Sequence, residues 1–285
     1  MAERSFKSEV LKLRAGQGDV FKGEGILAVT KALLQSGVSY VGGYQGSPIS
    51  HLMDVLNDAR DILQELGVHF ESSGSEATAA AMLSASINYP LRGAVTWKSV
   101  VGTNVAADAL SNLASSGVTG GAMVIVGEDY GEGSSIMQER TYAFAMKAQM
   151  WLLDPRPNLT SMVAMVEQGF RLSEASSTPV FYMMRIRECH VTGEFIAGDN
   201  VAPTYSNLNK VQPKREAEKI ILPPNVYEQE QEKVASRWPA AVQYISDNVL
   251  NEFFPGKYDE VGIIMCGGSY NTVIRALERQ GLADC

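Results

Sequence analysis

The sequence predicts an α/β fold in which a parallel sheet carries helices on both faces, followed by the start of a second α/β domain. Strand-like and helix-like segments alternate from about residue 23 to residue 188. The clearest strand, "GAMVIVGED" at 121–129, is continuously apolar, as expected for a strand buried on both faces. The segments between strands are long enough for helical crossovers, which connect parallel strands.

Each element is predicted from its periodicity and its end signals. Gly37 and Gly67 each close a segment with apolar residues at helical spacing, and Ser75 precedes an alanine-rich segment as a helix cap. The predicted helices are residues 25–37, 50–67, 75–88, 104–117, 134–149 and 159–177. The predicted strands are residues 38–44, 68–72, 93–97, 121–129, 150–154 and 179–186. We expect all six strands to be parallel, with 121–129 paired on both sides.

The pattern divides the chain into four parts. Residues 1–19 are an N-terminal extension, and residues 20–195 form the α/β domain. Residues 196–257, rich in Pro, Asn, Lys and Glu, are a linker or excursion with one helix. Residues 258–285 then begin a new strand, Gly-Gly turn and helix. Because one such unit cannot bury its own faces, we expect this sequence to be the front piece of a longer polypeptide.

Composition narrows the class of protein. A hydrophobic content of 45% and a charged content of 20% are globular values, and a net charge of −8 disfavours nucleic-acid binding. The sequence contains no apolar run of the roughly 18 residues that cross a membrane, and its N-terminus lacks an apolar signal core. We therefore expect a cytoplasmic protein without membrane contact. Cys189, Cys266 and Cys285 form no CxxC pair, so the sequence predicts no metal or iron–sulfur site in this chain.

In an open α/β sheet, ligands bind beyond the carboxyl ends of the strands, so the turns there are the candidate sites. In "GGYQGSPIS" the glycines let a ligand approach the main chain, and Ser47 offers a hydroxyl group. An ordinary strand–helix turn with Pro48 at the first helical position fits the same residues equally well.

A second turn, "HFESSGSEATAAA", places Glu76 in the first turn of the alanine-rich helix. Two interpretations remain open: a carboxylate held beside a buried ligand, or an acid placed to suit the helix dipole. Glu71 is the competing carboxylate.

Two further turns carry polar residues. "TWKSVVGTNVAAD" contains Lys98, Asn104 and Asp108, and "GEDYGEGSSIMQER" is glycine-rich and acidic, with Arg140 after it. Neither turn matches a phosphate-binding loop.

Several of these turns together resemble one family. "GEGILAVTKALLQSGVSYVGGYQGSP", "SEATAAAMLSAS", "KSVVGTNVAADALSNLASSGVTGGAMVIVGEDYGEGSS" and "VGIIMCGGSYNTVIRAL" are similar, in this order, to segments of the thiamine-diphosphate-dependent 2-oxoacid:ferredoxin oxidoreductases. The third segment most resembles the alpha subunits of indolepyruvate ferredoxin oxidoreductases and their fused, long-chain relatives. The resemblance covers residues 20–190 and resumes at the predicted second domain.

The resemblance implies a fold and a site. Residues 20–195 would be the domain that binds the aminopyrimidine end of thiamine diphosphate. Glu76 would be the catalytic carboxylate, whose hydrogen bond to N1′ prepares the aminopyrimidine to take the C2 proton. The implied cofactor-binding residues are Gly46, Ser47, Pro48, Glu76, Gly102 and Asn104, and the substrate-facing candidates are Lys98, Ser134, Ser135 and Arg140.

The resemblance also implies partners. The complete enzyme would decarboxylate a 2-oxoacid of indolepyruvate type, transfer the acyl group to CoA and pass electrons through [4Fe-4S] clusters to ferredoxin. The magnesium motif that holds the diphosphate and the cysteine-rich cluster motifs are absent from this sequence, so other domains or subunits must supply them and this chain alone should be inactive. A catalytically inactive partner subunit with the same fold and a non-oxidative thiamine-diphosphate decarboxylase are the alternatives.

Overall fold

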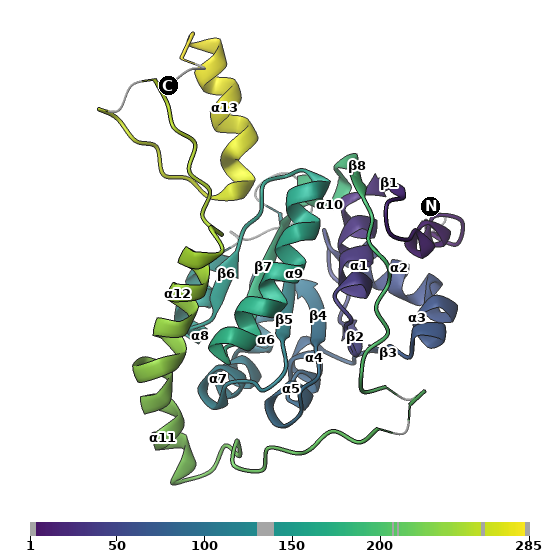
Figure 1. The fold of residues 1–285 in the computed structure, drawn as a ribbon, viewed down its shortest axis with the longest axis vertical. Coiled ribbons are helices and arrows are strands. Elements are labelled where there is room, and N and C mark those ends of the chain that lie inside the picture. The colour runs from purple at the N-terminus through teal and green to yellow at the C-terminus, as the bar shows by residue number, and fades with distance from the viewer. Residues whose placement is uncertain (1–3, 130–139, 207, 210, 258–259, 283–285) are drawn as a thin grey trace.

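A six-stranded parallel sheet forms the centre of the protein (Figure 1). The computed structural model describes residues 4–129, 140–206, 208–209, 211–257 and 260–282. The strand order is β3-β2-β4-β5-β7-β6, and every neighbouring pair is parallel. The strands are β2 Tyr40–Gly43, β3 His69–Ser72, β4 Gly93–Lys98, β5 Ala122–Glu128, β6 Trp151–Leu153 and β7 Val180–Arg185. The predicted fold class and the six parallel strands are confirmed, and β5 pairs on both sides as expected.

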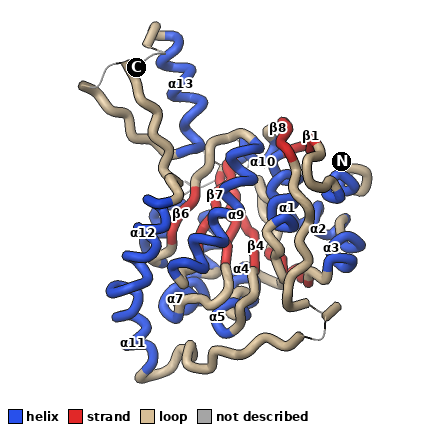
Figure 2. Tube along the Cα trace, viewed as in Figure 1, coloured by secondary structure: helices blue, strands red, loops and turns tan. Residues whose placement is uncertain are grey.

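Helices cover both faces of this sheet (Figure 2). The helices are α1 Gly25–Gln35, α2 Ser50–Asp58, α3 Arg60–Leu66, α4 Glu76–Met82, α5 Ala85–Asn88, α6 Ser99–Val105, α7 Ala107–Ser116, α8 Thr141–Ala148, α9 Leu159–Ser176, α10 Ile186–His190, α11 Asn225–Glu232, α12 Trp238–Asp247 and α13 Tyr270–Arg279. Short helical segments of other types are η1 Val10–Arg14, η2 Lys233–Arg237 and η3 Gly267–Ser269.

Strand β5 shows how the two hydrophobic cores arise. Met123 and Ile125 join a core with buried residues of α1, α2 and α9, whereas Val124 and Val126 join a core with residues of α4, α7 and α8. Successive side chains of a strand point to opposite faces, so a continuously apolar strand supplies both cores.

A second, two-stranded sheet was not predicted. Strand β1 (Val20–Glu24) pairs antiparallel with β8 (Thr192–Ile196). It joins the two ends of the segment predicted as one domain. The boundaries themselves remain a prediction, but this pairing ties residue 20 to residue 196.

Several predicted helices are broken. Residues 50–67 form α2 and α3, and residues 75–88 form α4 and α5. Helix α6 starts at Ser99, directly after β4, so the helix predicted from residue 104 begins earlier and is interrupted before α7. The predicted helix ends at Gly37 and Gly67 are confirmed, since both glycines have positive φ angles, +65° and +76°.

The chain after β8 wraps around the domain. The described residues between β8 and α11 have no regular structure, and then α11, η2 and α12 follow one another along the side of the sheet domain (Figure 1). The prediction of one helix in residues 196–257 is therefore wrong, because α11 precedes α12. Helix α12 packs on α9, where the Tyr244 hydroxyl group donates to Gln168 Oε1 at 2.8 Å. None of the described helices is long and apolar enough to cross a membrane.

The predicted strand near the C-terminus is not formed. Residues 260–266 have no regular secondary structure, and the side chain of Ile264 is fully exposed. The physical reason is that a strand needs a neighbouring strand to pair with, and the described residues offer none at this point. The predicted helix after the Gly-Gly turn is present as α13.

Candidate functional site

The turns after β2, β3 and β4 meet at one edge of the sheet. Gly43, near the end of β2, lies opposite Ser72 of β3 and Thr96 of β4. Because the strands are parallel, the three turns that follow project from the same edge. This is the place where the sequence predicts a cofactor.

Glu76 begins α4 at this edge. The N-terminus of α4 is fixed by a reciprocal cap, in which Ser75 Oγ accepts from the Thr78 N–H and Thr78 Oγ1 accepts from the Ser75 N–H. Glu76 is only 6% exposed. In the described part of the chain, no hydrogen bond or ion pair reaches its carboxylate. The carboxylate oxygens are not among the fully buried unpaired atoms of the described residues, so a ligand at this edge can reach them.

The competing carboxylate has a different environment. Glu71 lies on the edge strand β3, its side chain is 58% exposed, and Oε2 lies 3.7 Å from His69 Nε2. An exposed carboxylate is solvated by water and has little influence on a shielded reaction. The burial of Glu76 therefore favours it over Glu71, and disfavours the interpretation of Glu76 as an exposed acid that only suits the helix dipole.

Gly102 packs directly against Glu76. A Cβ atom on Gly102 would lie 2.9 Å from Glu76 Cγ and 2.5 Å from Trp97 Cδ1. Trp97 is fully buried, and its indole N–H donates to Thr103 Oγ1 at 3.1 Å. Glycine is therefore required at position 102 for packing, because any side chain would push α6 away from Glu76 or displace Trp97.

The turn after β2 lies across β4. Lys98 Nζ donates to the main-chain oxygen of Ser47 at 2.7 Å, and a Cβ atom on Gly46 would lie 2.6 Å from Lys98 Cβ. A Cβ atom on Gly43 would lie 2.2 Å from the Thr96 oxygen. Contacts within the protein thus explain why this turn is short of side chains.

The helix after this turn, α2, begins after Pro48 and not at it. Helix α2 begins at Ser50, with Ile49 as its N-cap, so Pro48 lies before the helix. The expectation of Pro48 at the first helical position is therefore wrong. Pro48 and Ile49 instead belong to the turn, which passes β4 and reaches β5. A Cβ atom on Gly127 of β5 would lie 2.7 Å from Ile49 Cβ.

The structure thus places the predicted residues in two groups at the end of β4. Glu76 and Gly102 lie together with Trp97, and Gly46 and Ser47 lie together with Lys98. Asn104 is exposed near the end of α6, and Arg140 is exposed directly before α8. Ser134 and Ser135 lie outside the described residues.

A charged network at the ends of β6 and β7 was not predicted as part of a site. Arg185 forms two hydrogen bonds to Asp154, Nη1 to Oδ1 at 2.6 Å and Nη2 to Oδ2 at 2.9 Å. Glu188 Oε2 accepts from the Arg185 main-chain N–H at 2.7 Å. Glu188 is 1% exposed, and this burial raises its pKa to about 8. The signal in the sequence is a charged residue directly after an apolar strand, as in "MWLLD" and "VFYMMRI".

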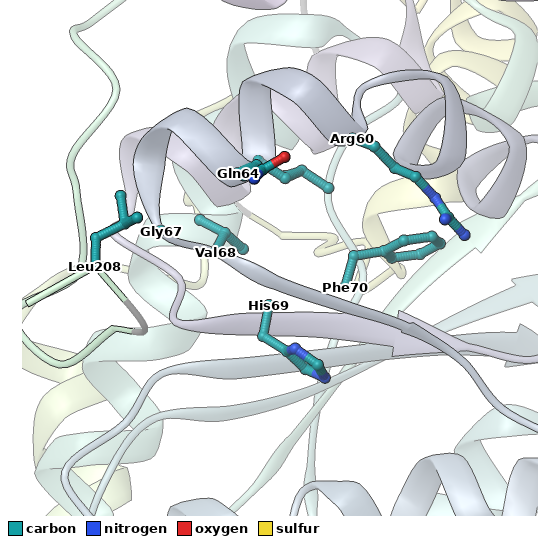
Figure 3. Close-up of a pocket in the computed structure, with 8 residues that line it drawn as sticks. Arg60, Gln64, Gly67, Val68, His69, Phe70 and Leu208 are labelled. Carbon is teal, nitrogen blue, oxygen red and sulfur yellow. The ribbon is translucent and has the colours of Figure 1, made fainter.

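A cavity of about 310 Å³ lies elsewhere, beside the edge strand β3 (Figure 3). Its lining comes from α3, β3, the turn between them and the chain after β8. The lining residues are Arg60, Leu63, Gln64, Gly67, Val68, His69, Phe70 and Leu208. The Arg60 guanidinium lies 5.4 Å from the centre of the Phe70 ring. This lining contains none of the predicted site residues, and the cavity is not part of the candidate site.

Comparison with known proteins identifies relatives over nearly the whole chain. No protein-family model matches. IorA subunits of indolepyruvate oxidoreductase from Methanothermobacter thermautotrophicus and Methanothermobacter marburgensis are 28% and 29% identical to this chain, each over 95% of it. The corresponding subunit of Archaeoglobus fulgidus is 25% identical over 90% of the chain. The predicted family resemblance is confirmed. This chain spans 42% of the length of the two Methanothermobacter IorA subunits.

The fold has a solved relative. A 2-oxoglutarate:ferredoxin oxidoreductase from Magnetococcus marinus, with 2-oxoglutarate, coenzyme A and succinyl-CoA bound, superposes with a TM-score of 0.60. The match covers 93% of this chain and 52% of that one, at 14% sequence identity. At this identity the likeness concerns the fold, which is the fold predicted from the sequence.

Proposed function

We propose that this chain forms the aminopyrimidine-binding part of a thiamine-diphosphate site in a 2-oxoacid:ferredoxin oxidoreductase. The observation that carries the proposal is Glu76, a buried carboxylate without a partner in the described part of the chain, at the sheet edge where open α/β folds bind ligands. The names of the IorA relatives and of the solved neighbour support the reaction class.

The residues at the edge fit this cofactor. Thiamine diphosphate supplies a carbanion-stabilising centre, and its aminopyrimidine needs an acid at one ring nitrogen. Glu76 would hold a proton at that nitrogen, N1′. The Glu76 side chain is mostly buried, so few water molecules can compete with the cofactor for it. Trp97 and Gly102 confine the side chain from the protein side.

The other predicted residues would have supporting roles. Gly46, Ser47 and Pro48 would line the same edge from the turn after β2. Lys98, between that turn and α6, and Arg140 are the candidates for binding the carboxylate of the substrate, because a 2-oxoacid is an anion. We propose an indolepyruvate-type 2-oxoacid as substrate on the names of the relatives.

Other parts of the enzyme would complete the reaction. Domains or subunits other than this chain would bind the diphosphate through magnesium and carry the [4Fe-4S] clusters. They would also make the contacts with CoA and ferredoxin. This division agrees with the 42% of the length of the Methanothermobacter relatives that the chain covers.

The test is Glu76→Gln in the complete enzyme, with Glu71→Gln as the matched control. The amide keeps the size of Glu76 but cannot supply a proton. We expect turnover of 2-oxoacids, followed by reduction of a viologen dye in the presence of CoA, to fall by about 10²- to 10⁴-fold. The melting temperature should stay close to that of the wild type. Glu71→Gln should leave both quantities unchanged.

Three outcomes would count against the proposal. A Glu76→Gln enzyme with wild-type turnover would contradict the assignment of the acid. Loss of turnover in Glu71→Gln alone would transfer the role to that residue. An assembled wild-type enzyme that turns over no 2-oxoacid would favour the inactive partner subunit.

A further inference from the structure

The loop after β6, residues 154–156, contacts two separate stretches of the C-terminal segment. We propose that this loop is a clamp that holds residues 252–254 and 268–270 of the same chain to the sheet domain. The clamp consists of Asp154 and Arg156, with Arg185 supporting Asp154. This inference does not depend on the proposed function.

The first half of the clamp is Arg156. Its guanidinium donates twice to Glu252, from Nε to Oε2 and from Nη2 to Oε1, both at 2.6 Å. The same guanidinium lies 5.5 Å from the ring centre of Phe254 and 5.1 Å from that of Tyr270. The two rings are themselves 5.3 Å apart. Paired hydrogen bonds to a carboxylate and stacking on aromatic rings are the two contacts that arginine makes best.

The partners of Arg156 come from two separate places in the sequence. Glu252 and Phe254 come shortly after α12, whereas Tyr270 is the first residue of α13. One side chain therefore ties the residues after α12 and the start of α13 to the loop after β6.

The second half of the clamp is Asp154. Its Oδ1 accepts the main-chain N–H of Gly268 at 3.2 Å, while both carboxylate oxygens bind Arg185. A Cβ atom on Gly267 would lie 2.0 Å from the Asp154 main-chain oxygen, and one on Gly268 would lie 1.4 Å from Arg185 Nη1. The Gly-Gly turn can approach the sheet domain this closely only without side chains.

Hydrophobic burial adds little support to this segment in the described structure. Val261 is 76% exposed and Ile264 is fully exposed, so hydrophobic burial does not hold these residues. Helix α13 has 10 residues and no buried residue. A helix of this length is marginal by itself in water, so its stability should depend on the contacts that begin it, at Gly268 and Tyr270.

The clamp also has a place relative to the candidate site. The ends of β6 and β7 belong to the same sheet edge as the turns around Glu76, at the other end of the strand order. The clamp therefore fixes the start of α13 at the ends of β6 and β7.

The experiment measures amide hydrogen exchange in α13 of the full chain. Arg156→Gln removes the paired hydrogen bonds and the cation. Its control is Arg171→Gln, which removes the exposed ion pair with Glu167 on α9. Gly268→Ala adds a methyl group that prevents the Gly-Gly turn from lying so close to Arg185. Its control is Gly262→Ala, in the same segment, where no atom lies within 4 Å of the added Cβ.

We expect exchange in α13 to be about 5- to 30-fold faster in Arg156→Gln and in Gly268→Ala than in the wild type. Exchange in the six-stranded sheet should not change, and both control variants should behave as wild type. Wild-type exchange of α13 in the two clamp variants would overturn the proposal, as would equal acceleration in the controls.

A charge reversal tests whether the effect of changing Arg156 comes from loss of its ion pair with Glu252 or from a general loss of structure. In the double variant Arg156→Glu with Glu252→Arg, the ion pair can form again without the original stacking. We expect exchange in α13 to be slower than in Arg156→Glu alone. Equal exchange in the single and double variants would show that the Arg156–Glu252 contact does not hold the segment.

Discussion

Replacing Gly102 by alanine tests how closely α6 must approach Glu76. Within a helix the change from glycine to alanine stabilises by about 1 kcal/mol, whereas overpacking a core costs about 1–3 kcal/mol. The added Cβ would lie 2.5 Å from Trp97 Cδ1, and Trp97 is fully buried, so the overpacking cost should prevail. We expect a net loss of stability of about 0–2 kcal/mol.

The effect on catalysis should be larger than the effect on stability. The Cβ would also lie 2.9 Å from Glu76 Cγ, so the carboxylate must shift or change rotamer. Displacing a catalytic group by about 1 Å can cost 10²-fold in rate. We therefore expect the kcat of the complete enzyme to fall about 100-fold, with little change in the KM for the 2-oxoacid.

The matched control is Gly74→Ala, two residues before Glu76, where no atom lies within 4 Å of the added Cβ. Dye-linked turnover and thermal unfolding are measured for both variants. If Gly102→Ala retains the kcat of Gly74→Ala, or if its loss of activity only follows a loss of folded protein, then Gly102 does not position Glu76.

Two further predictions concern pH and the chain alone. Burial raises the pKa of Glu188 to about 8, from 4.5 when unfolded, so the folded state binds the additional proton between these pH values. The unfolding free energy of the wild type should therefore fall as pH rises through this window, by at most about 1.4 kcal/mol per unit from this group, and Glu188→Gln should lose that component. Equal slopes in denaturant titrations of both proteins would contradict this. The purified chain alone should reduce no viologen dye with any 2-oxoacid and CoA, because the magnesium and cluster motifs are absent from its sequence, and dye reduction by the chain alone would refute the division of the site.

Local patterns were enough to predict the central sheet. A run such as "GAMVIVG" is buried on both faces wherever it lies, so its neighbours need not be known. The β1–β8 sheet could not be found in this way. Phe21 pairs with Phe195, which lies far away in the sequence, and neither strand has an apolar pattern that identifies it alone. The strand predicted at the start of residues 258–285 is absent for the converse reason, since the apolar residues there lack a partner strand in the described structure.

The sequence pointed to Glu76 but not to its surroundings. An acid after a capping serine can be recognised in a sequence, whereas its burial follows from the packing of α6 and Trp97 on α4. The glycines of "GGYQGSP" were interpreted as a place for a ligand, yet the structure shows Thr96 and Lys98 against them. A glycine reports that something lies close, and the sequence alone does not say whether that is a ligand or the next strand.

The measurement that tests the central claim most directly is the exchange of the C2 proton of thiamine diphosphate bound to the complete enzyme. This exchange precedes any contact with substrate or ferredoxin, so it isolates the acid at N1′. If Glu76 supplies that acid, exchange in Glu76→Gln should be slower by about 10²- to 10⁴-fold at an unchanged melting temperature. Exchange at the wild-type rate, with the cofactor bound, would contradict the account.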